Sequence, residues 1–255
     1  MSYSTVTEVP GDRITRDALT MAYTRYTFAA QYCDKGRVLE VGCGAGQGLG
    51  YLGSRARSVI GGDYTHELLT RARAHYGCRF PILRLDAERL PFRDASFDVV
   101  VLCEAIYYLA DAPRFVDEAR RILVPRGILV VTSVNKEWID FNPSPFAIHY
   151  FSAPELRALL EDRGFRSELF VGFPVRMESI RDYLVSFLKR SAVRLGLIPR
   201  TMKGKELLKR IFLGPVTSVP PEITNATGTF EVPTPMNSGA SVRGFKVLYA
   251  VGRAR

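Results

Sequence analysis

The feature that most constrains this chain is the segment RVLEVGCGAGQGLGYL at residues 37–52, where a strand-like apolar run leads directly into several glycines. Glycine carries no Cβ atom, so it permits positive φ angles in a tight turn and lets another molecule approach the backbone closely. A helix that starts after such a turn presents free N–H groups and the positive end of its dipole. The segment therefore predicts a strand, a turn and a helix arranged around a ligand that contacts backbone atoms.

Short aliphatic runs alternate with helical patterns along much of the 255-residue chain, whose N-terminal part also has helical character. One helix is expected at 152–164, with Ser152 as N-cap and Glu155 three residues later. Others are expected at 65–76 and 113–124. The strands are expected at 37–42, 58–64, 81–87, 97–105, 127–134, 166–173 and 245–253. Because strand–helix alternation builds a parallel sheet covered on both faces, the sequence predicts an α/β fold.

Two ligand classes compete for the glycine turn. The dinucleotide fingerprint G-x-G-x-x-G occurs at residues 48–53, but this position lies too far past the strand and would fall inside the helix. Counted from Gly42, the same spacing places Gln47 where the third glycine is required. The pattern that fits the turn is E-x-G-x-G-x-G at residues 40–46. A nicotinamide-dependent oxidoreductase is kept as the alternative.

With this pattern the chain begins to resemble the class I S-adenosylmethionine-dependent methyltransferases. The similarity continues through GGDY at 61–64, LDAERLPFRDASFDVVVLCEAIYYLAD at 85–111 and EARRILVPRGILVVTS at 118–133. It is especially close to the small-molecule branch called type 11, and it covers roughly residues 25–170 and the last strand. The resemblance implies a Rossmann-like, seven-stranded, mostly parallel sheet whose last strand is antiparallel, with helices on both faces. It implies transfer of a methyl group to an O, N or C acceptor on a small molecule, such as a natural product, sugar or lipid-like metabolite.

The resemblance also assigns roles to particular residues. The glycine turn would lie against the methionine part of S-adenosylmethionine, Asp63 would accept hydrogen bonds from the ribose hydroxyls, and Asp86 would hold the adenine edge. The complete set expected to bind the cofactor is Tyr26, Glu40, Gly42, Cys43, Gly44, Gly46, Asp63, Tyr64, Asp86, Ala87 and Glu104. For Cys43 itself, a small packing residue in the turn is expected rather than a reactive thiol.

Methyl transfer from a sulfonium requires alignment more than a protein nucleophile, and it requires no metal. A general base helps when the acceptor is a hydroxyl. The residues expected to serve catalysis are His149, which follows the fifth strand and is the candidate base, and Tyr108, which is expected to line the acceptor pocket beside Tyr107. Packing roles for the histidine and for both tyrosines are the alternatives.

The net charge of +9 is concentrated in the last third of the chain. Residues 1–170 hold 21 basic and 21 acidic side chains, whereas residues 171–255 hold 14 and 5. Apolar positions at helical spacing, flanked by Arg and Lys, make residues 176–210 compatible with a membrane surface or an acidic carrier. Nucleic acid is not an expected partner, because the excess is local and the N-P-P-Y tetrapeptide of base-amine methyltransferases is missing. A nucleic-acid methyltransferase is nevertheless the further alternative.

Four segments are expected along the chain. A helical segment at 1–36 lies over the cofactor site, and residues 37–173 form the S-adenosylmethionine-binding core. A basic lid is inserted at 174–243, and 244–255 supplies the final core strand. The four cysteines show no metal-binding spacing and are expected as reduced, mostly buried thiols. Without a signal peptide or an apolar run of about 20 residues, a cytoplasmic protein is expected, of undetermined oligomeric state.

Overall fold

The computed structural model describes residues 3, 7–175, 216–237 and 242–255. The strands are β1 (Arg13–Thr15), β2 (Arg37–Val41), β3 (Ser58–Asp63), β4 (Ile82–Arg84), β5 (Phe97–Cys103), β6 (Leu123–Val134), β7 (Phe165–Pro174), β8 (Val216–Ser218), β9 (Thr234–Pro235) and β10 (Phe245–Ala254). The helices are α1 (Arg16–Ala30), α2 (Leu49–Gly53), α3 (His66–Tyr76), α4 (Ala112–Ile122) and α5 (Ala153–Glu161), with a short 3₁₀ turn η1 (Ile106–Tyr108).

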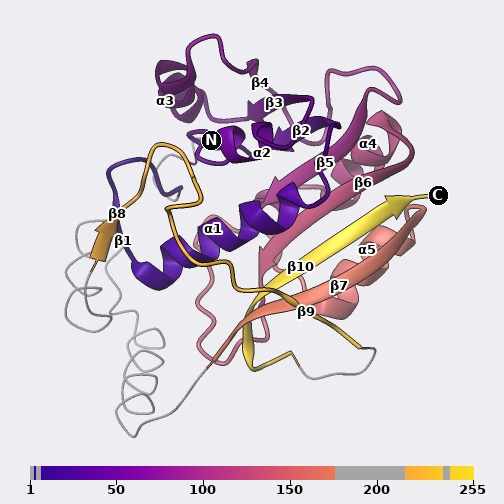
Figure 1. Ribbon diagram of the computed structural model, residues 1–255. Helices are drawn as coiled ribbons and strands as arrows, with labels where there is room; N and C mark the ends of the chain where they lie inside the picture. Colours follow the sequence, from indigo (N-terminus) through magenta and orange to yellow (C-terminus); the bar gives the residue numbers. More distant parts are fainter. Residues whose placement is uncertain (1–2, 4–6, 176–215, 238–241) are drawn as a thin grey trace, which may run out of the picture.

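Eight strands form the main sheet in the order β4-β3-β2-β5-β6-β10-β7-β9 (Figure 1). Strands β2 to β6 are parallel, and β10 is antiparallel to both of its neighbours, β6 and β7. This confirms the predicted mostly parallel sheet with an antiparallel last strand. The eighth strand, β9, was not expected: it adds two residues to the edge beside β7.

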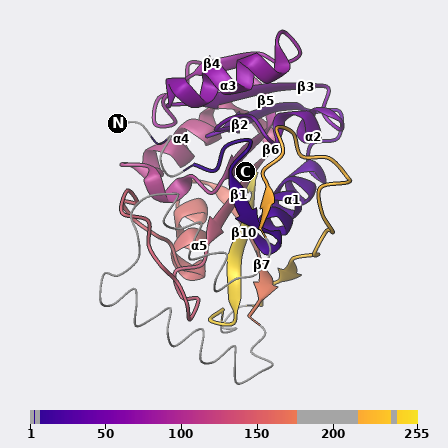
Figure 2. The same ribbon diagram turned by 90° about the vertical axis from the view of Figure 1, so that its left-hand side faces the viewer.

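Helices cover both faces of the sheet, as predicted. One core cluster joins α4 and α5 to the sheet, and a second joins α1, α2 and α3 to its other face. Figure 2 shows α4 and α5 on one side of the strands and α1 and α2 on the other. No helix within the described residues is both long enough and apolar enough to cross a membrane.

The local signals in the sequence explain several element boundaries. Ser152 caps α5 through the predicted capping box with Glu155, and Thr15 caps α1 by accepting a hydrogen bond from the Ala18 N–H. The G-x-G-x-x-G spacing at 48–53 overlaps α2 and does not form the turn after β2. Strand β6 starts at Leu123, earlier than expected, because its first residue pairs with Phe97 ahead of a register shift in the sheet.

Residues 216–237 belong to the predicted insertion and lie along α1 and the glycine turn. Strand β8 pairs with β1 in a separate two-stranded sheet, and the Ile223 N–H donates to the Gln47 carbonyl over 2.8 Å. The apolar positions at helical spacing expected within residues 176–210, and the basic residues that flank them, lie outside the described residues.

Candidate functional site

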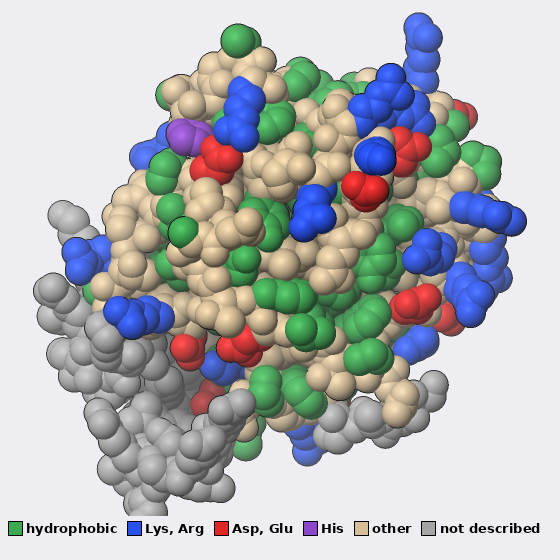
Figure 3. All heavy atoms as spheres, in the orientation of Figure 1, with side chains coloured by type: hydrophobic (Ala, Val, Ile, Leu, Met, Phe, Trp, Pro, Cys, Tyr) green, Lys and Arg blue, Asp and Glu red, His purple; other side chains and the backbone are tan. Residues whose placement is uncertain are grey.

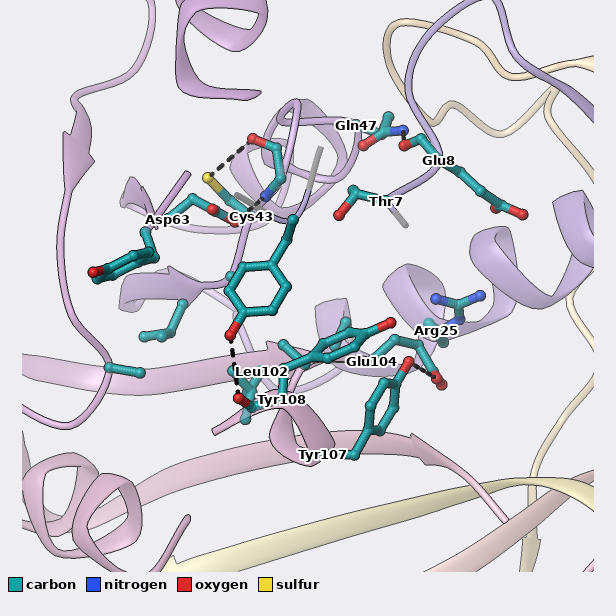
Figure 4. Close-up of a pocket in the computed structure, with 18 of the residues that line it drawn as sticks. Thr7, Glu8, Arg25, Cys43, Gln47, Asp63, Leu102, Glu104, Tyr107 and Tyr108 are labelled. Carbon is teal, nitrogen blue, oxygen red and sulfur yellow. Dashed lines mark hydrogen bonds between the residues drawn. The ribbon is translucent and has the colours of Figure 1, made fainter. Parts of the chain in front are cut away.

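A cavity of about 670 Å³ lies at the carboxyl ends of β2, β3, β4 and β5 (Figure 4). Its wall is formed by the glycine turn, the chain that follows β3, β4 and β5, helix α1, the N-terminal segment and part of the insertion. Ligands of open parallel sheets bind at this end of the strands. The cavity therefore lies where the glycine turn predicts that a ligand contacts the backbone.

The turn after β2 needs glycine for conformational reasons. The φ angles of Gly42, Gly44 and Gly46 are 71°, 57° and 83°, a region that strains residues with a side chain. A Cβ atom on Gly44 would lie 3.3 Å from the Thr7 Cγ2 atom, at the cavity surface. On Gly46 it would lie 3.0 Å from the Cβ atom of Ala72, on the side of α3. Gly42 and Gly44 thus expose backbone to the cavity, whereas Gly46 serves packing against α3.

Asp63, the last residue of β3, is buried at the cavity wall and is tied to the turn. Its Oδ2 atom accepts a hydrogen bond from the Gly44 N–H over 2.9 Å, and its Oδ1 atom accepts one from the Thr65 N–H over 2.7 Å. Burial raises the pKa of Asp63, and these backbone hydrogen bonds counteract that rise. A carboxylate only accepts hydrogen bonds, so Asp63 offers the hydroxyl groups of a ligand an acceptor at the cavity wall.

Asp86 and Ala87 follow β4 and line the neighbouring part of the cavity. One oxygen of Asp86 accepts a hydrogen bond from the Glu88 N–H over 2.9 Å, which closes a turn. Tyr64 lines the same part and is largely exposed, with the Arg84 guanidinium 5.5 Å from its ring centre. Asp86 therefore combines a structural role in the turn with a position at the cavity surface.

Tyr26 reaches from α1 over the glycine turn and lines the cavity. Its hydroxyl donates to Glu40 Oε1 over 2.8 Å, and both side chains are buried. Glu40 Oε2 has no hydrogen-bond partner within the described part of the chain. Burial raises the pKa of Glu40 to about 7, although the Tyr26 hydrogen bond lowers it in part. Glu40 thus fixes the Tyr26 hydroxyl through this hydrogen bond and does not itself line the cavity.

Glu104 follows β5 and points into the cavity from a strained backbone position, with φ of 52°. The Tyr107 hydroxyl donates to Glu104 Oε2 over 3.1 Å (Figure 4). Burial, and after it the charge of Glu104, raise the pKa of Tyr107 well above its ordinary value, so Tyr107 stays protonated as a donor. Such strain in a residue other than glycine is typical of functional sites.

Tyrosine rings gather beside Glu104. The Tyr107 and Tyr108 ring centres lie 4.6 Å apart, and the Tyr3 and Tyr108 centres lie 5.2 Å apart. The Tyr3 hydroxyl also donates to the Tyr108 carbonyl over 3.4 Å. The three rings all line the cavity, so Tyr108 stands where the sequence placed it, at one wall of the site.

The structure brings together most, but not all, of the residues that the sequence nominates. Those that line the cavity are Tyr26, Gly42, Cys43, Gly44, Asp63, Tyr64, Asp86, Ala87, Glu104 and Tyr108. Glu40 and Gly46 lie behind this surface. His149 also lies outside it: its side chain is 54% exposed and its Nε2 atom is 4.0 Å from Glu155 Oε2. Its neighbour Ile148 takes the place at the cavity wall.

Several lining residues escaped the sequence interpretation. Thr7 and Glu8 come from the N-terminal segment, which the Gln47 side chain holds by donating to the Glu8 carbonyl over 2.8 Å. Val219 and Ile223 come from the insertion. No local motif marks these positions, because only the tertiary fold brings them to the turn.

Arg25 was also missed, although it precedes the nominated Tyr26. Its Nε atom donates to the Met21 carbonyl over 3.2 Å, and no other hydrogen bond from its guanidinium is found within the described residues. Burial alone would lower the pKa of Arg25, but nearby carboxylates, Glu104 first among them, raise it above its ordinary value. Arg25 is therefore a permanent cation at the cavity wall, and its terminal N–H groups have no hydrogen-bond partner among the described residues.

Negative charge prevails among the side chains that line the cavity. Arg25 is the one cation there within the described residues, and it faces five carboxylates, those of Glu8, Asp63, Asp86, Glu88 and Glu104.

Nowhere in the described ranges do three or more His, Cys, Asp or Glu side chains form a group able to hold a metal ion. All four cysteines are free, and Cys33, Cys43 and Cys103 are buried. Burial raises the pKa of Cys103 to about 12, which keeps this cavity-lining residue a thiol.

Comparison with known proteins identifies the family. Residues 39–131 match the family model described as "Methyltransferase domain". A phthiotriol/phenolphthiotriol dimycocerosates methyltransferase of Mycobacterium leprae is 31% identical over 197 residues, which are 69% of this chain and 68% of that protein. The chain therefore belongs to the class I S-adenosylmethionine-dependent methyltransferases, as the sequence resemblance predicts.

Other relatives agree over shorter or more distant matches. A "Probable S-adenosylmethionine-dependent methyltransferase" of Mycolicibacterium smegmatis is 39% identical over 153 residues. The match spans 58% of each chain, so the chain covers less than two thirds of that relative. The crystal structure of the YcgJ protein of Bacillus subtilis matches with a TM-score of 0.58 at 17% identity, over 94% of this chain and 98% of that one. This last likeness shows the fold.

Proposed function

We propose that the protein transfers a methyl group from S-adenosylmethionine to an acceptor atom of a small molecule, and that the described cavity holds both. The observation that carries the proposal is the hydrogen bond between Asp63 and the glycine turn that follows β2. The carboxylate that ends β3 is fixed by the Gly44 N–H at a part of the cavity wall where Gly42 and Gly44 carry no side chain.

The residues present fit this cofactor along its whole length. The carboxylate of Asp63, which accepts hydrogen bonds at the cavity wall, matches the hydroxyl donors of a ribose diol. Asp86 and Ala87 lie one strand further along the sheet edge, where the adenine would be placed. At the other end, the free terminal nitrogens of Arg25 match the methionine carboxylate, because guanidinium and carboxylate pair through two parallel hydrogen bonds. The backbone of Gly42 and Gly44 lies between these ends.

The work left to the protein is placement. Bound S-adenosylmethionine supplies a methyl group on a positively charged sulfur, which is already a good leaving group. The chain must align the acceptor with that methyl and keep water away, which makes catalysis a matter of proximity and orientation. Tyr26, Tyr107 and Tyr108 surround the space in which this alignment would take place.

We further propose a largely apolar, lipid-like acceptor. Aliphatic side chains from β1, α1 and the insertion line the cavity, those of Ile14, Leu19, Ala22, Val219 and Ile223. Apolar lining of this kind favours an acceptor with apolar parts. The name of the M. leprae relative, a phthiotriol/phenolphthiotriol dimycocerosates methyltransferase, also refers to lipid-like compounds.

The predicted contact of residues 176–210 with a membrane surface or an acidic carrier stays a prediction, since these residues lie outside the described part. On the face that Figure 3 shows, basic and acidic side chains are interspersed over the described residues. Tight binding to RNA or DNA that falls steeply with salt would instead favour a nucleic-acid methyltransferase.

Thermal unfolding in the presence of two ligands tests the proposed cofactor. S-adenosylhomocysteine, the demethylated product, should raise the unfolding midpoint, because a ligand at 100 times its Kd stabilises the folded state by about 2.7 kcal/mol. NAD should leave the midpoint unchanged, and a rise with NAD alone would favour the oxidoreductase alternative.

Two matched variants test whether the bound ligand contacts Asp63. In Asp63→Asn an NH2 group, which donates hydrogen bonds, replaces one acceptor oxygen. The affinity for S-adenosylhomocysteine, measured by isothermal titration calorimetry, should therefore fall at least tenfold. Asp98→Asn is the control: this carboxylate is bonded to the Arg37 side chain at the start of β5, and its loss should leave the affinity unchanged. Equal affinities in both variants would contradict the ribose role of Asp63.

A further inference from the structure

We propose that Glu104 is the general base of the reaction and that the acceptor atom is a hydroxyl oxygen. The inference rests on the proposed function, since it places a proton acceptor beside the transferred methyl group. It replaces the expectation that His149 serves as base, because His149 does not reach the cavity.

The position of Glu104 supports this role. It follows β5, the strand next to β2 in the sheet, and its neighbour Ala105 is the residue that a Cβ atom on Gly42 would meet at 3.0 Å. Glu104 therefore lies between the position proposed for the ribose, at Asp63, and the position proposed for the methionine carboxylate, at Arg25. The sulfonium would be placed in this middle part.

The side chain of Glu104 is held at one oxygen, and the other has no hydrogen-bond partner among the described residues. Oε2 accepts the Tyr107 hydrogen bond, whereas Oε1 accepts none from any residue that the structure describes. Three of the other four lining carboxylates are engaged elsewhere: Asp63 binds the turn, Asp86 closes its own loop, and Glu88 Oε1 accepts from the Asp111 N–H over 2.8 Å. The fourth, Glu8, lies in the N-terminal segment and not at the end of a core strand. A fixed carboxylate with a free oxygen facing a reaction space is the arrangement that general-base catalysis requires.

The charges around the cavity favour a hydroxyl over other acceptors. Five carboxylates against one guanidinium repel an anionic acceptor. An amine would be held as an ammonium by the same carboxylates, because nearby negative charge raises its pKa, and an ammonium has no lone pair to attack with. A neutral hydroxyl suffers neither penalty but gains from losing its proton.

The step balances without a further reagent. As the acceptor oxygen bonds to the methyl carbon, the carbon–sulfur bond breaks and its electron pair stays on sulfur, which gives neutral S-adenosylhomocysteine. The hydroxyl proton passes to Glu104 Oε1 and later to solvent. Tyr107 keeps Glu104 oriented through its hydrogen bond to Oε2.

Two cofactor analogues test the placement without an acceptor. Sinefungin carries an ammonium group where S-adenosylmethionine carries its transferable methyl, whereas S-adenosylhomocysteine carries nothing there. Calorimetry should show that Glu104→Gln weakens sinefungin at least about tenfold more than S-adenosylhomocysteine, which corresponds to about 1.4 kcal/mol. Glu88→Gln removes the same charge at the adenine end and keeps an oxygen for the Asp111 N–H, so the ratio of the two affinities should stay at the wild-type value.

The outcomes separate this inference from the proposed function. If Glu104→Gln weakens both analogues equally, Glu104 binds the methionine part and is not the base; an unchanged ratio with unchanged affinities overturns the proposal as well. If the wild-type protein binds neither analogue, the proposed function itself fails.

A labelling experiment tests the hydroxyl assignment. With methyl-labelled S-adenosylmethionine and three probes of equal chain length, decan-1-ol should be labelled faster than decylamine or decanoate. Faster labelling of the amine or the acid would refute the hydroxyl assignment.

Discussion

Glu40 is a carboxylate that the fold buries completely beneath the glycine turn. The Tyr26 hydroxyl satisfies one of its oxygens, and the other has no partner among the described residues. A charge in such a place is unfavourable, which is why burial raises the pKa of Glu40 to about 7. The residue that supports the site is therefore expected to make the stability of the fold depend on pH.

Glu40→Gln should measure this dependence. The folded-state pKa of Glu40 is above its unfolded value, so the folded state holds the proton more tightly and loses stability as the pH rises from about 4.5 to about 7. A neutral glutamine avoids this loss. Relative to the wild type, the variant should gain stability of the order of 3 kcal/mol between pH 4.5 and pH 8. Urea unfolding at both pH values gives the difference, and a difference that does not change with pH would contradict the buried charge.

Single residues also show where sequence reasoning succeeds and where it stops. Asp63 was nominated from the family resemblance, and the fold brings it to the glycine turn because the parallel strands β2 and β3 end at the same edge of the sheet. His149 was nominated from its place after β6, but a loop position does not fix the direction of a side chain. There the chain turns Ile148 to the cavity and leaves His149 half-exposed to solvent.

At the scale of elements, the strand–turn–helix unit of β2, the glycine turn and α2 determines the geometry of the site. Its backbone conformation could be predicted, because only glycine adopts the required φ angles without strain. The contribution of β1 and β8 could not be predicted, since three-residue strands carry no alternation pattern and their pairing joins residues more than 200 positions apart. The start of β6 was missed for a related reason: Pro125 and Gly127 are typical of a turn, yet the sheet continues through them.

Gly44→Ala separates backbone strain from steric exclusion. An alanine at a φ angle of 57° costs about 1–2 kcal/mol of stability, and its methyl group would also enter the cavity surface beside Thr7. Binding of S-adenosylhomocysteine should therefore weaken at least tenfold. Gly77→Ala is the matched control, because Gly77 has a φ angle of 55° and no atom within 4 Å of the added Cβ. It should lose stability but keep its affinity, and calorimetry combined with urea unfolding distinguishes the two effects. Equal affinities in both variants would contradict the close approach of backbone and ligand.

At the scale of the whole molecule, three distant parts of the chain enclose the cavity. The core strands supply the glycine turn and the carboxylates, the N-terminal segment supplies Thr7 and Glu8, and the insertion supplies Val219 and Ile223. The two outer parts are joined to one another by backbone hydrogen bonds: Gly11 donates to the Val219 carbonyl and Val219 donates to the Asp12 carbonyl. The core could be predicted from alternation and motif spacing, whereas this outer wall depends on contacts that no local pattern encodes.

Hydrogen exchange of individual amides tests whether the outer wall closes on a ligand. The Val219 N–H donates to the Asp12 carbonyl, and the Ile223 N–H donates to the Gln47 carbonyl, both over 2.8 Å. Because their side chains line the cavity, a ligand bound there should suppress the local openings through which these amides exchange. Saturating S-adenosylhomocysteine should slow the exchange of both amides by about tenfold or more, because a ligand that binds only the closed state makes the local opening rarer.

The Met236 N–H is the internal control. It donates over 2.8 Å to the Leu169 carbonyl at the sheet edge beside β9, away from the cavity, and its local exchange should not change. If Met236 is slowed as much as Val219 and Ile223, the ligand acts only through global stability, and the insertion forms no closing wall.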